Sequence, residues 1–319
     1  MKEDVILFLK RALLFVALIF MTDSILGYGL KKLYFIQKKG QFAQTTYAVD
    51  STYQDILIFG SSRATRHYKP DIFSSKIKMS CYNGGRDGQM IPFSAALEDV
   101  TFKRYIPKII LLDINPWELS KGRSKYEKLS ILFPYFNYHP ELESHLDRIN
   151  KGEKYKLLSK TYAFNSSLFI SLNNFILEKR LPKENSGYLP LTGIMTKEAY
   201  EDYLSKSASI NASEFKNNSL DTTAVNLYTS FLKKARKHGI KTFVFISPCI
   251  LNNSFNPFKK NLIKQIALEE GAAFYDYSGD SRFNNNYTLF SDIFHLNNVG
   301  AEIYTKLVAD NLQVYNHTP

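Results

Sequence analysis

Apolar runs and helical periods alternate along two parts of the chain, at about 55–117 and 241–312. Short runs of β-forming residues predict five buried strands, at 55–59, 77–82, 108–113, 241–247 and 272–277. Periodic apolar positions predict helices at 91–104, 223–238, 258–270 and 297–312. Strands that alternate with helices favour an α/β protein in which helices cover both faces of a mostly parallel five-stranded sheet, a flavodoxin-like three-layer α/β/α fold.

The segment from about 118 to 222 interrupts this alternation. It is rich in Tyr, Phe, Lys and Asn, shows weak helical periods and few strand signals, and is longer than a normal crossover connection. We therefore expect a mostly helical insertion that packs over one edge of the sheet.

An apolar run at 12–21 follows Lys10 and Arg11 near the N-terminus. A bilayer span needs about 20 apolar residues, so three interpretations stay open: a signal peptide, a single membrane anchor or a buried helix. No small-x-small cleavage site stands clearly after the run, so the sequence favours an uncleaved anchor from about Val5 to Leu30. The expected organisation is an anchor at 1–30, a juxtamembrane linker at 31–53 and a main domain at 54–319.

Basic residues on both sides of this run leave its orientation ambiguous. Lys10 and Arg11 precede the run, whereas Lys31 and Lys32 follow it. We expect a single-pass membrane protein whose main domain lies outside the cytoplasm.

The 319 residues carry a formal net charge of +11, which is spread over many short lysine pairs. Such a surface suits anionic lipid or polymer. A nucleic-acid partner is not expected, because the chain has no recognisable nucleic-acid-binding motif. Cys81 and Cys249 lie in apolar runs without the spacing of metal ligands or of a disulfide framework, and we expect buried free thiols.

The strand predicted at 55–59 ends at Gly60, and Ser61 and Ser62 follow. A strand that breaks at glycine and presents a serine is how α/β enzymes expose a nucleophile at the carboxyl edge of a sheet. An ordinary strand followed by a serine helix cap fits the same residues. The C-terminal part of the chain decides between them.

Asp292 and His295 form an Asp-x-x-His pair between the last predicted strand and the last predicted helix. The carboxylate can hold the imidazole through its Nδ1–H and leave Nε2 to take a proton from a serine. Parallel topology puts this loop at the same sheet edge as Ser62. This placement favours a Ser-His-Asp site over a simple helix cap at Asp292.

These residues resemble the SGNH/GDSL superfamily of serine esterases and acyltransferases, particularly its membrane-anchored relatives in bacterial envelope polysaccharide modification. The resemblance covers about 55–117 and 241–312. It implies that Ser62 is the nucleophile, in a Gly-x-Ser-Arg form of the first block, and that Asp292 and His295 form the last block.

The same resemblance implies three donors to the oxyanion of the reaction. They are the N–H of Ser62, the N–H of Gly85 in a second block that reads Asn83-x-Gly85, and the side-chain amide of Asn115. The third block keeps only Asn115, because the glycine and aspartate typical of the family are absent.

The activity implied by the resemblance is that of a membrane-tethered serine esterase or O-acyltransferase that acts on acyl, above all acetyl, esters of envelope carbohydrate. No cofactor and no metal are implied. The expected partners are the acylated carbohydrate, the membrane and a membrane acyltransferase. Two alternatives stay open: a catalytically degenerate member that binds glycan or assists a membrane acyltransferase, and a basic surface protein bound to anionic polymer.

Arg63 and Trp117 complete the candidate residues. Arg63 fits the binding of an anionic substrate and a solvated helix face about equally. Trp117 fits stacking on a sugar ring, and fits better a core aromatic beside a strand end. The histidines at 139, 145, 238 and 317 have no partners at metal-ligand spacing and are expected on the surface.

Overall fold

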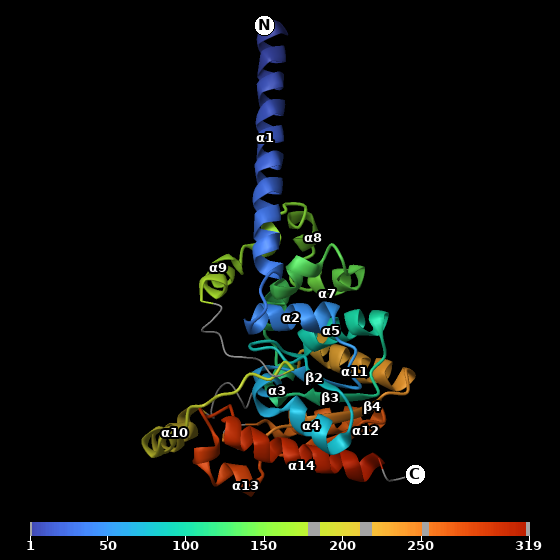
Figure 1. The fold of residues 1–319 in the computed structure, drawn as a ribbon, viewed down its shortest axis with the longest axis vertical. Helices are drawn as coiled ribbons and strands as arrows, with labels where there is room; N and C mark the ends of the chain where they lie inside the picture. The colour runs from blue at the N-terminus through green and yellow to red at the C-terminus, as the bar shows by residue number, and fades with distance from the viewer. Residues whose placement is uncertain (1, 178–185, 211–218, 251–254, 317–319) are drawn as a thin grey trace. The chain divides into compact units, whose positions relative to one another are not determined.

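The computed structural model describes residues 2–177, 186–210, 219–250 and 255–316. The chain divides into two units: residues 1–43 with 126–181, and residues 44–125 with 182–319. We call the first the N-terminal unit and the second the sheet unit (Figure 1).

Five parallel strands form the sheet, in the order β2-β1-β3-β4-β5. Their bounds are β1 Ile56–Gly60, β2 Cys81–Asn83, β3 Ile109–Asp113, β4 Lys241–Ile246 and β5 Ala273–Asp276. Every residue of β1, β2 and β3 is buried, which explains their nearly continuous apolar runs. The prediction of a mostly parallel five-stranded sheet in a three-layer α/β/α fold is confirmed.

Helices cover both faces of this sheet. One layer contains α3 Ser62–His67, α4 Pro70–Ile77 and α14 Asn298–Asn316, and the other contains α5 Ile91–Arg104, α11 Thr222–Lys237 and α12 Pro257–Glu269. Because successive side chains along a strand point to opposite faces of the sheet, each strand packs against both helix layers. Ile58 belongs to the cluster that contains Tyr68 and Tyr304, whereas Phe59 lies edge-to-face on Phe231 of α11, with ring centroids 5.2 Å apart.

β1 and β3 are direct neighbours, paired from Ile56↔Ile109 to Gly60↔Asp113. β2 lies on one side of this pair, and β4 and β5 lie on the other, so the order in which strands are added switches sides between β1 and β3. In open α/β sheets, ligands bind outside the carboxyl ends of the strands at such a switch point. The residues that follow Gly60 and Asp113 therefore occupy the expected place for a site.

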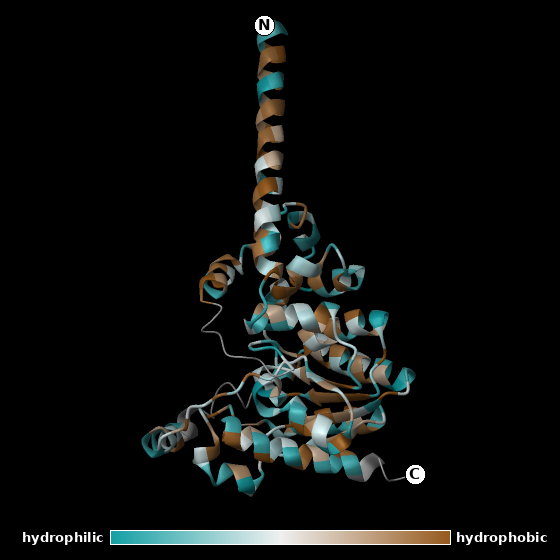
Figure 2. Ribbon diagram, in the orientation of Figure 1, coloured by the Kyte–Doolittle hydropathy of each residue, from teal (hydrophilic) through white to brown (hydrophobic). Residues whose placement is uncertain are grey.

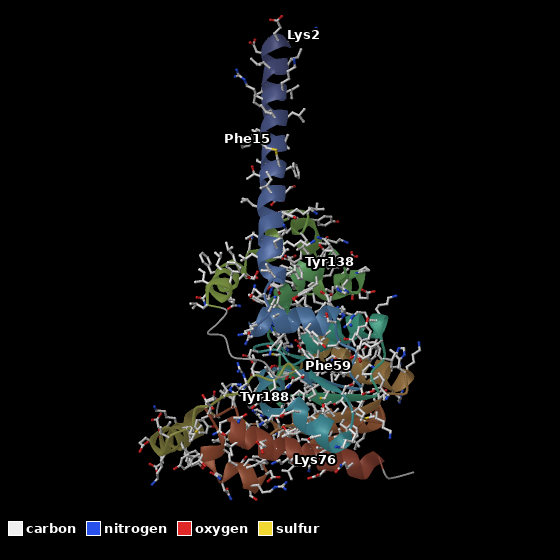
Figure 3. The ribbon with its side chains drawn as sticks, in the orientation of Figure 1. Lys2, Phe15, Phe59, Lys76, Tyr138 and Tyr188 are labelled. Carbon is white, nitrogen blue, oxygen red and sulfur yellow. The ribbon has the colours of Figure 1, made fainter. Side chains whose placement is uncertain are left out.

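The N-terminal unit is built around α1 Lys2–Phe35, whose apolar side chains are largely exposed. Phe15 on this helix is 64% exposed, whereas Phe59 in the sheet is fully buried (Figure 3). The helix is long and apolar enough to cross a membrane, although an N-terminal signal sequence has the same properties (Figure 2).

The remaining elements lie outside the two layers that cover the sheet. The N-terminal unit contains η2 Lys128–Tyr135, η3 Pro140–Leu142, α7 Glu143–Leu146, α8 Glu153–Lys156, η4 Tyr162–Phe164 and α9 Leu168–Ile176. The sheet unit contains η1 Pro116–Leu119, α10 Lys197–Ile210, α13 Ser281–Asn284 and η7 Tyr287–Leu289. Two helices, α2 Gly40–Asp50 and α6 Ser124–Glu127, lie where the chain passes between units.

Three expectations differ from this arrangement. The linker expected at 31–53 is largely helical, because α1 continues to Phe35 and α2 follows. The insertion expected at 118–222 is divided, since residues 126–181 join α1 and the part from 182 onward belongs to the sheet unit. His145 is buried at 2% exposure, so its expected surface position is wrong, and His317 lies outside the described residues. Cys81 and Cys249 are buried free thiols, as predicted.

Candidate active site

Gly60 sets the place where Ser62 leaves the sheet. Its φ of +145° is rarely adopted by other residues, and a Cβ at this position would lie 2.6 Å from the carbonyl oxygen of Asp113. The chain then turns at once into α3. Ser61 caps this helix by accepting the N–H of Arg63 at 3.4 Å, and Ser62 is the first helical residue.

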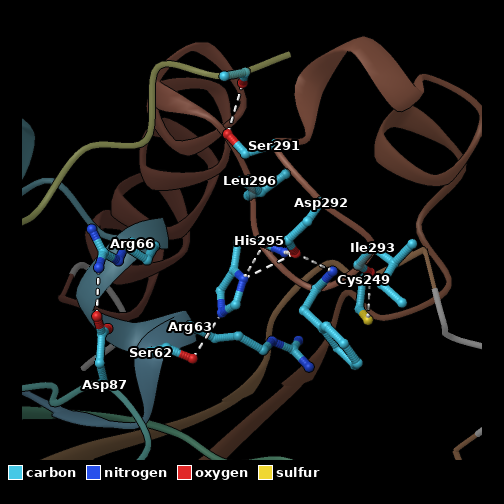
Figure 4. A network of polar contacts seen from close by, with 12 residues as sticks. Ser62, Arg63, Arg66, Asp87, Cys249, Ser291, Asp292, Ile293, His295 and Leu296 are labelled. Carbon is cyan, nitrogen blue, oxygen red and sulfur yellow. Dashed lines mark hydrogen bonds and ion pairs between the residues drawn. The ribbon is translucent and has the colours of Figure 1, made fainter. Parts of the chain in front are cut away.

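His295 lies between Ser62 and Asp292, within hydrogen-bonding distance of each (Figure 4). The Oγ of Ser62 is 2.8 Å from Nε2 of His295. The Nδ1 of His295 is 3.0 Å and 2.9 Å from the two carboxylate oxygens of Asp292. An ionised carboxylate can only accept, so Nδ1 carries the proton and Nε2 is free to accept the serine hydroxyl.

Several donors surround the Asp292 carboxylate. It accepts the backbone N–H of Phe294 at 2.8 Å and that of His295 at 3.0 Å, besides the imidazole N–H. Burial alone raises the pKa of this carboxyl, but the hydrogen bonds and the His295 imidazole outweigh it and hold the pKa below its usual value. Asp292 is therefore ionised at neutral pH, as an orienting carboxylate requires.

A short backbone loop carries His295 to the serine. Phe290 and Leu296 form an antiparallel bridge, and the N–H of Ser291 donates to the carbonyl of His295 at 2.9 Å. The N–H of Leu296 donates to Nε2 of His67 at 3.0 Å. The imidazole of His67 thus holds the residue that directly follows the candidate base.

His67 is a residue whose role the sequence did not reveal. It is fully buried, and its Nδ1 lies 3.1 Å from the hydroxyl of Ser247. Because Nε2 accepts the Leu296 N–H, Nδ1 must carry the proton and donate to Ser247. Burial, then the charges of Arg63 and His295, hold the pKa of His67 well below its usual value, so this imidazole is neutral.

Arg63 lies beside His67 and corrects the expectation of a solvated helix face. It is 1% exposed, so direct contact with a soluble substrate does not fit its position either. Its Nε donates to the Ser247 hydroxyl at 3.0 Å, and its terminal nitrogens donate to the Ser247 carbonyl and to Oδ1 of Asn115. One guanidinium therefore joins the ends of β1, β3 and β4.

The contact with Arg63 fixes the orientation of the Asn115 amide. A guanidinium only donates, so Oδ1 of Asn115 must face it and Nδ2 must point the other way. Nδ2 lies 3.4 Å from the Oγ of Ser61, directly beside the candidate nucleophile. Asn115 thus donates toward Ser61, the residue before the candidate nucleophile, although the rest of the third block is altered.

Glu118 holds the backbone of Asn115. Its carboxylate accepts the N–H of Asn115 at 3.0 Å and the N–H of Ile91 at 2.6 Å. The group is fully buried, and burial raises its pKa to about 7 against the effect of these two hydrogen bonds. No local pattern in the sequence marks this residue as part of a site.

The amide of Gly85, the second expected oxyanion donor, has a protein acceptor. Its N–H donates to Oδ1 of Asn83 at 3.0 Å, and the Asn83 amide donates to the carbonyls of Ala64 and Tyr68. A Cβ at Gly85 would lie 2.7 Å from the Cβ of Ala64, so glycine lets this turn approach α3 closely. Its role as an oxyanion donor stays a prediction.

Trp117 is partly buried and packs in an aromatic group. Its ring lies 5.4 Å from that of Phe255 and 5.8 Å from that of Phe294, both edge-to-face. Phe294 directly precedes His295, so Trp117 supports the loop that carries the imidazole. Stacking on a sugar ring stays a prediction.

Comparison with known proteins gives no assignment. No protein-family model matches this chain, and the search of curated proteins finds no match. The function must therefore be argued from the geometry of the site.

Proposed function

We propose that this protein is a membrane-tethered serine esterase or O-acyltransferase of the SGNH/GDSL type, acting on acyl, above all acetyl, esters of envelope carbohydrate. The observation that carries the proposal is the 2.8 Å distance from Ser62 Oγ to His295 Nε2, with Asp292 on the opposite ring nitrogen. Nucleophile, base and orienting carboxylate in this relation are the parts that acyl transfer needs.

The chemistry follows from these contacts. Ser62 Oγ attacks the ester carbonyl while His295 Nε2 takes its proton, and the imidazolium then returns the proton to the departing alcohol. The oxyanion forms at the N-terminus of α3, near the amide of Asn115. Water or a sugar hydroxyl, deprotonated by His295, then removes the acyl group from the serine.

The carbohydrate substrate and the membrane tether rest on the resemblance and on α1. The apolar side chains of α1 are exposed along its length, which suits a lipid environment. A net charge of +11 suits an anionic envelope polymer. The sheet unit is placed outside the cytoplasm in this proposal.

A serine-directed fluorophosphonate probe tests the nucleophile. The wild-type chain should be labelled and Ser62→Ala should not, whereas the neighbouring Ser61→Ala keeps the label. Equal labelling of wild type and Ser62→Ala would refute the assignment.

The fate of the acyl group needs a second experiment. Incubation with an acetyl donor and a glycan acceptor, followed by measurement of free acetate and of acetylated glycan, separates hydrolysis from transfer. Ser62→Ala serves as the blank for both products.

One observation favours a second candidate, a catalytically degenerate member that binds glycan or assists a membrane acyltransferase. The amide of Gly85 already donates to Asn83, and the third block lacks two of its usual residues. This candidate predicts that Ser62→Ala and His295→Ala leave the cellular phenotype intact. Loss of the phenotype in either variant would count against it.

A further inference from the structure

A pocket of about 310 Å³ lies beside α1 within the N-terminal unit. Its walls include the apolar side chains of Pro134, Leu157 and Phe164, and its polar groups come from Ser24, Lys31, Tyr138 and Lys160. The volume is at the lower end of the range of about 300–1,000 Å³ typical of small-molecule sites. It suits a head group better than a large ligand.

Two lysines give the pocket its charge. The ammonium of Lys31 donates to the hydroxyl of Tyr138 and lies 4.8 Å from the centre of that ring, which is labelled in Figure 3. None of the ion pairs recorded for the described part of the chain involves Lys31 or Lys160. Neither lysine is therefore neutralised by an ion pair within the described part of the chain.

The backbone around Lys160 is fixed against α1. The N–H of Lys160 donates to the carboxylate of Asp23 at 2.6 Å, and Ser159 and Thr161 donate to the same carboxylate through their hydroxyls. A Cβ at Gly27 would lie 2.4 Å from the Cβ of Lys160, so only glycine permits this approach. Asp23 offsets one of the two positive charges and leaves the pocket with a net positive charge.

The pocket continues an apolar stripe on α1. Ser24, Gly27 and Lys31 follow one another at helical spacing, and Leu13, Val16 and Phe20 precede them at intervals of three and four on the same face. These three apolar side chains are 72%, 46% and 65% exposed. A cationic pocket thus lies at one end of a lipid-compatible stripe.

We propose that this pocket binds the phosphate head group of an anionic phospholipid whose acyl chains lie along the stripe. Lys31 and Lys160 contact the phosphate, and the hydroxyls of Tyr138 and Ser24 donate to its oxygens. The inference needs α1 to lie in the membrane but is independent of the chemistry at Ser62.

Native mass spectrometry of the full-length chain in detergent tests the site. Titration with phosphatidylglycerol should give one bound lipid, and phosphatidylcholine with the same acyl chains should bind about tenfold more weakly. Lys31→Ala/Lys160→Ala should weaken phosphatidylglycerol binding by about tenfold or more. Tyr138→Phe, which keeps the ring, should cause a smaller loss.

The matched control is Lys151→Ala/Lys154→Ala, which removes the same charge from the same unit, at exposed Lys151 and at Lys154, which pairs with Glu143. It should bind phosphatidylglycerol like the wild type. Equal losses in the two double variants, or equal affinity for both lipids, would overturn the proposal.

Two further measurements identify the source of the anion and the state of the protein. Inorganic phosphate should not displace the lipid at equal concentration, and displacement would reassign the pocket to a soluble phosphate. The thermal unfolding midpoint of Lys31→Ala/Lys160→Ala should match that of the wild type, which shows that the variant is folded whether or not Ser62 is reactive.

Discussion

The triad and the polar network behind it differ in their access to solvent. The side chains of His295 and Asp292 are 22% and 51% exposed, whereas Arg63 is 1% exposed and His67 is fully buried. The exposed groups can meet a substrate. The buried ones fix where the exposed groups lie, since Arg63 orients Asn115 and His67 holds the backbone next to His295. Under the proposed function, the exposed residues react and the buried residues position them.

The largest effect is expected at the triad. In Ser62→Ala and in His295→Ala, hydrolysis of an activated aryl acetate should fall by about 10⁴-fold or more, because each group is needed for the same step. Stopped-flow or absorbance measurements of kcat/KM check this. Ser61→Ala should lose far less, and an equal loss there would move the nucleophile to Ser61.

A smaller loss is expected for the buried guanidinium and the amide it orients. Arg63→Met and Asn115→Ala should each lower kcat by about 10²–10³-fold with little change in KM, the usual cost of one oxyanion donor. Since Arg63 acts through Asn115, the double variant should lose no more than either single variant. Additive losses in this double-mutant cycle would show that Arg63 acts by another route.

Two buried titrating groups should give opposite pH dependences of stability. The pKa of His67 is depressed in the folded chain, so its contribution is present at neutral pH and is lost as the pH falls below about 6.5. The pKa of Glu118 is raised to about 7, so its contribution is present below about 4.5 and is lost, by about 3 kcal/mol, as the pH rises through 7.

Thermal unfolding between pH 4.5 and 7.5 measures both contributions. In His67→Gln only the Glu118 contribution remains, so stability should fall as the pH rises. In Glu118→Gln only the His67 contribution remains, so stability should rise with pH. Identical pH profiles in the two variants would contradict this assignment of charges.

The smallest effect is expected at Arg66, one turn after Arg63 on the same helix. Arg66 pairs with Asp87, and the two side chains are 17% and 24% exposed. Arg66→Ala should cost less than about 1 kcal/mol of unfolding free energy and change kcat by less than about threefold. A loss as large as that of Arg63→Met would remove the distinction between the partly buried Arg66 and the fully buried Arg63.

The sequence predicts the strands and the three candidate catalytic residues because each depends on a local pattern. An apolar run bounded by Gly60 marks β1, and an Asp-x-x-His spacing marks the last loop. The topology rule for parallel sheets then brings these segments to one edge. No contact had to be known in advance.

The positioning network is different, because its partners are distant in sequence. Arg63 meets Ser247 across 184 positions, and His67 meets Leu296 across 229. A charged residue on a short helix is exposed in most proteins, so local reasoning places Arg63 in solvent. The available signal was that Ser247 directly follows β4, at the edge where the ends of β1 and β3 also lie.

Ser62 and His295 are 233 positions apart, and this separation determines when the site can form during synthesis of the chain. During translation Ser62 is synthesised and leaves the ribosome long before His295. The growing polypeptide therefore carries the Ser62 hydroxyl without the imidazole that would activate it. Under the proposed function, ester cleavage can begin only after the loop that carries His295 has reached Ser62. Covalent capture of Ser62 by a suicide reagent would therefore count finished molecules in a mixed population of nascent and mature ones.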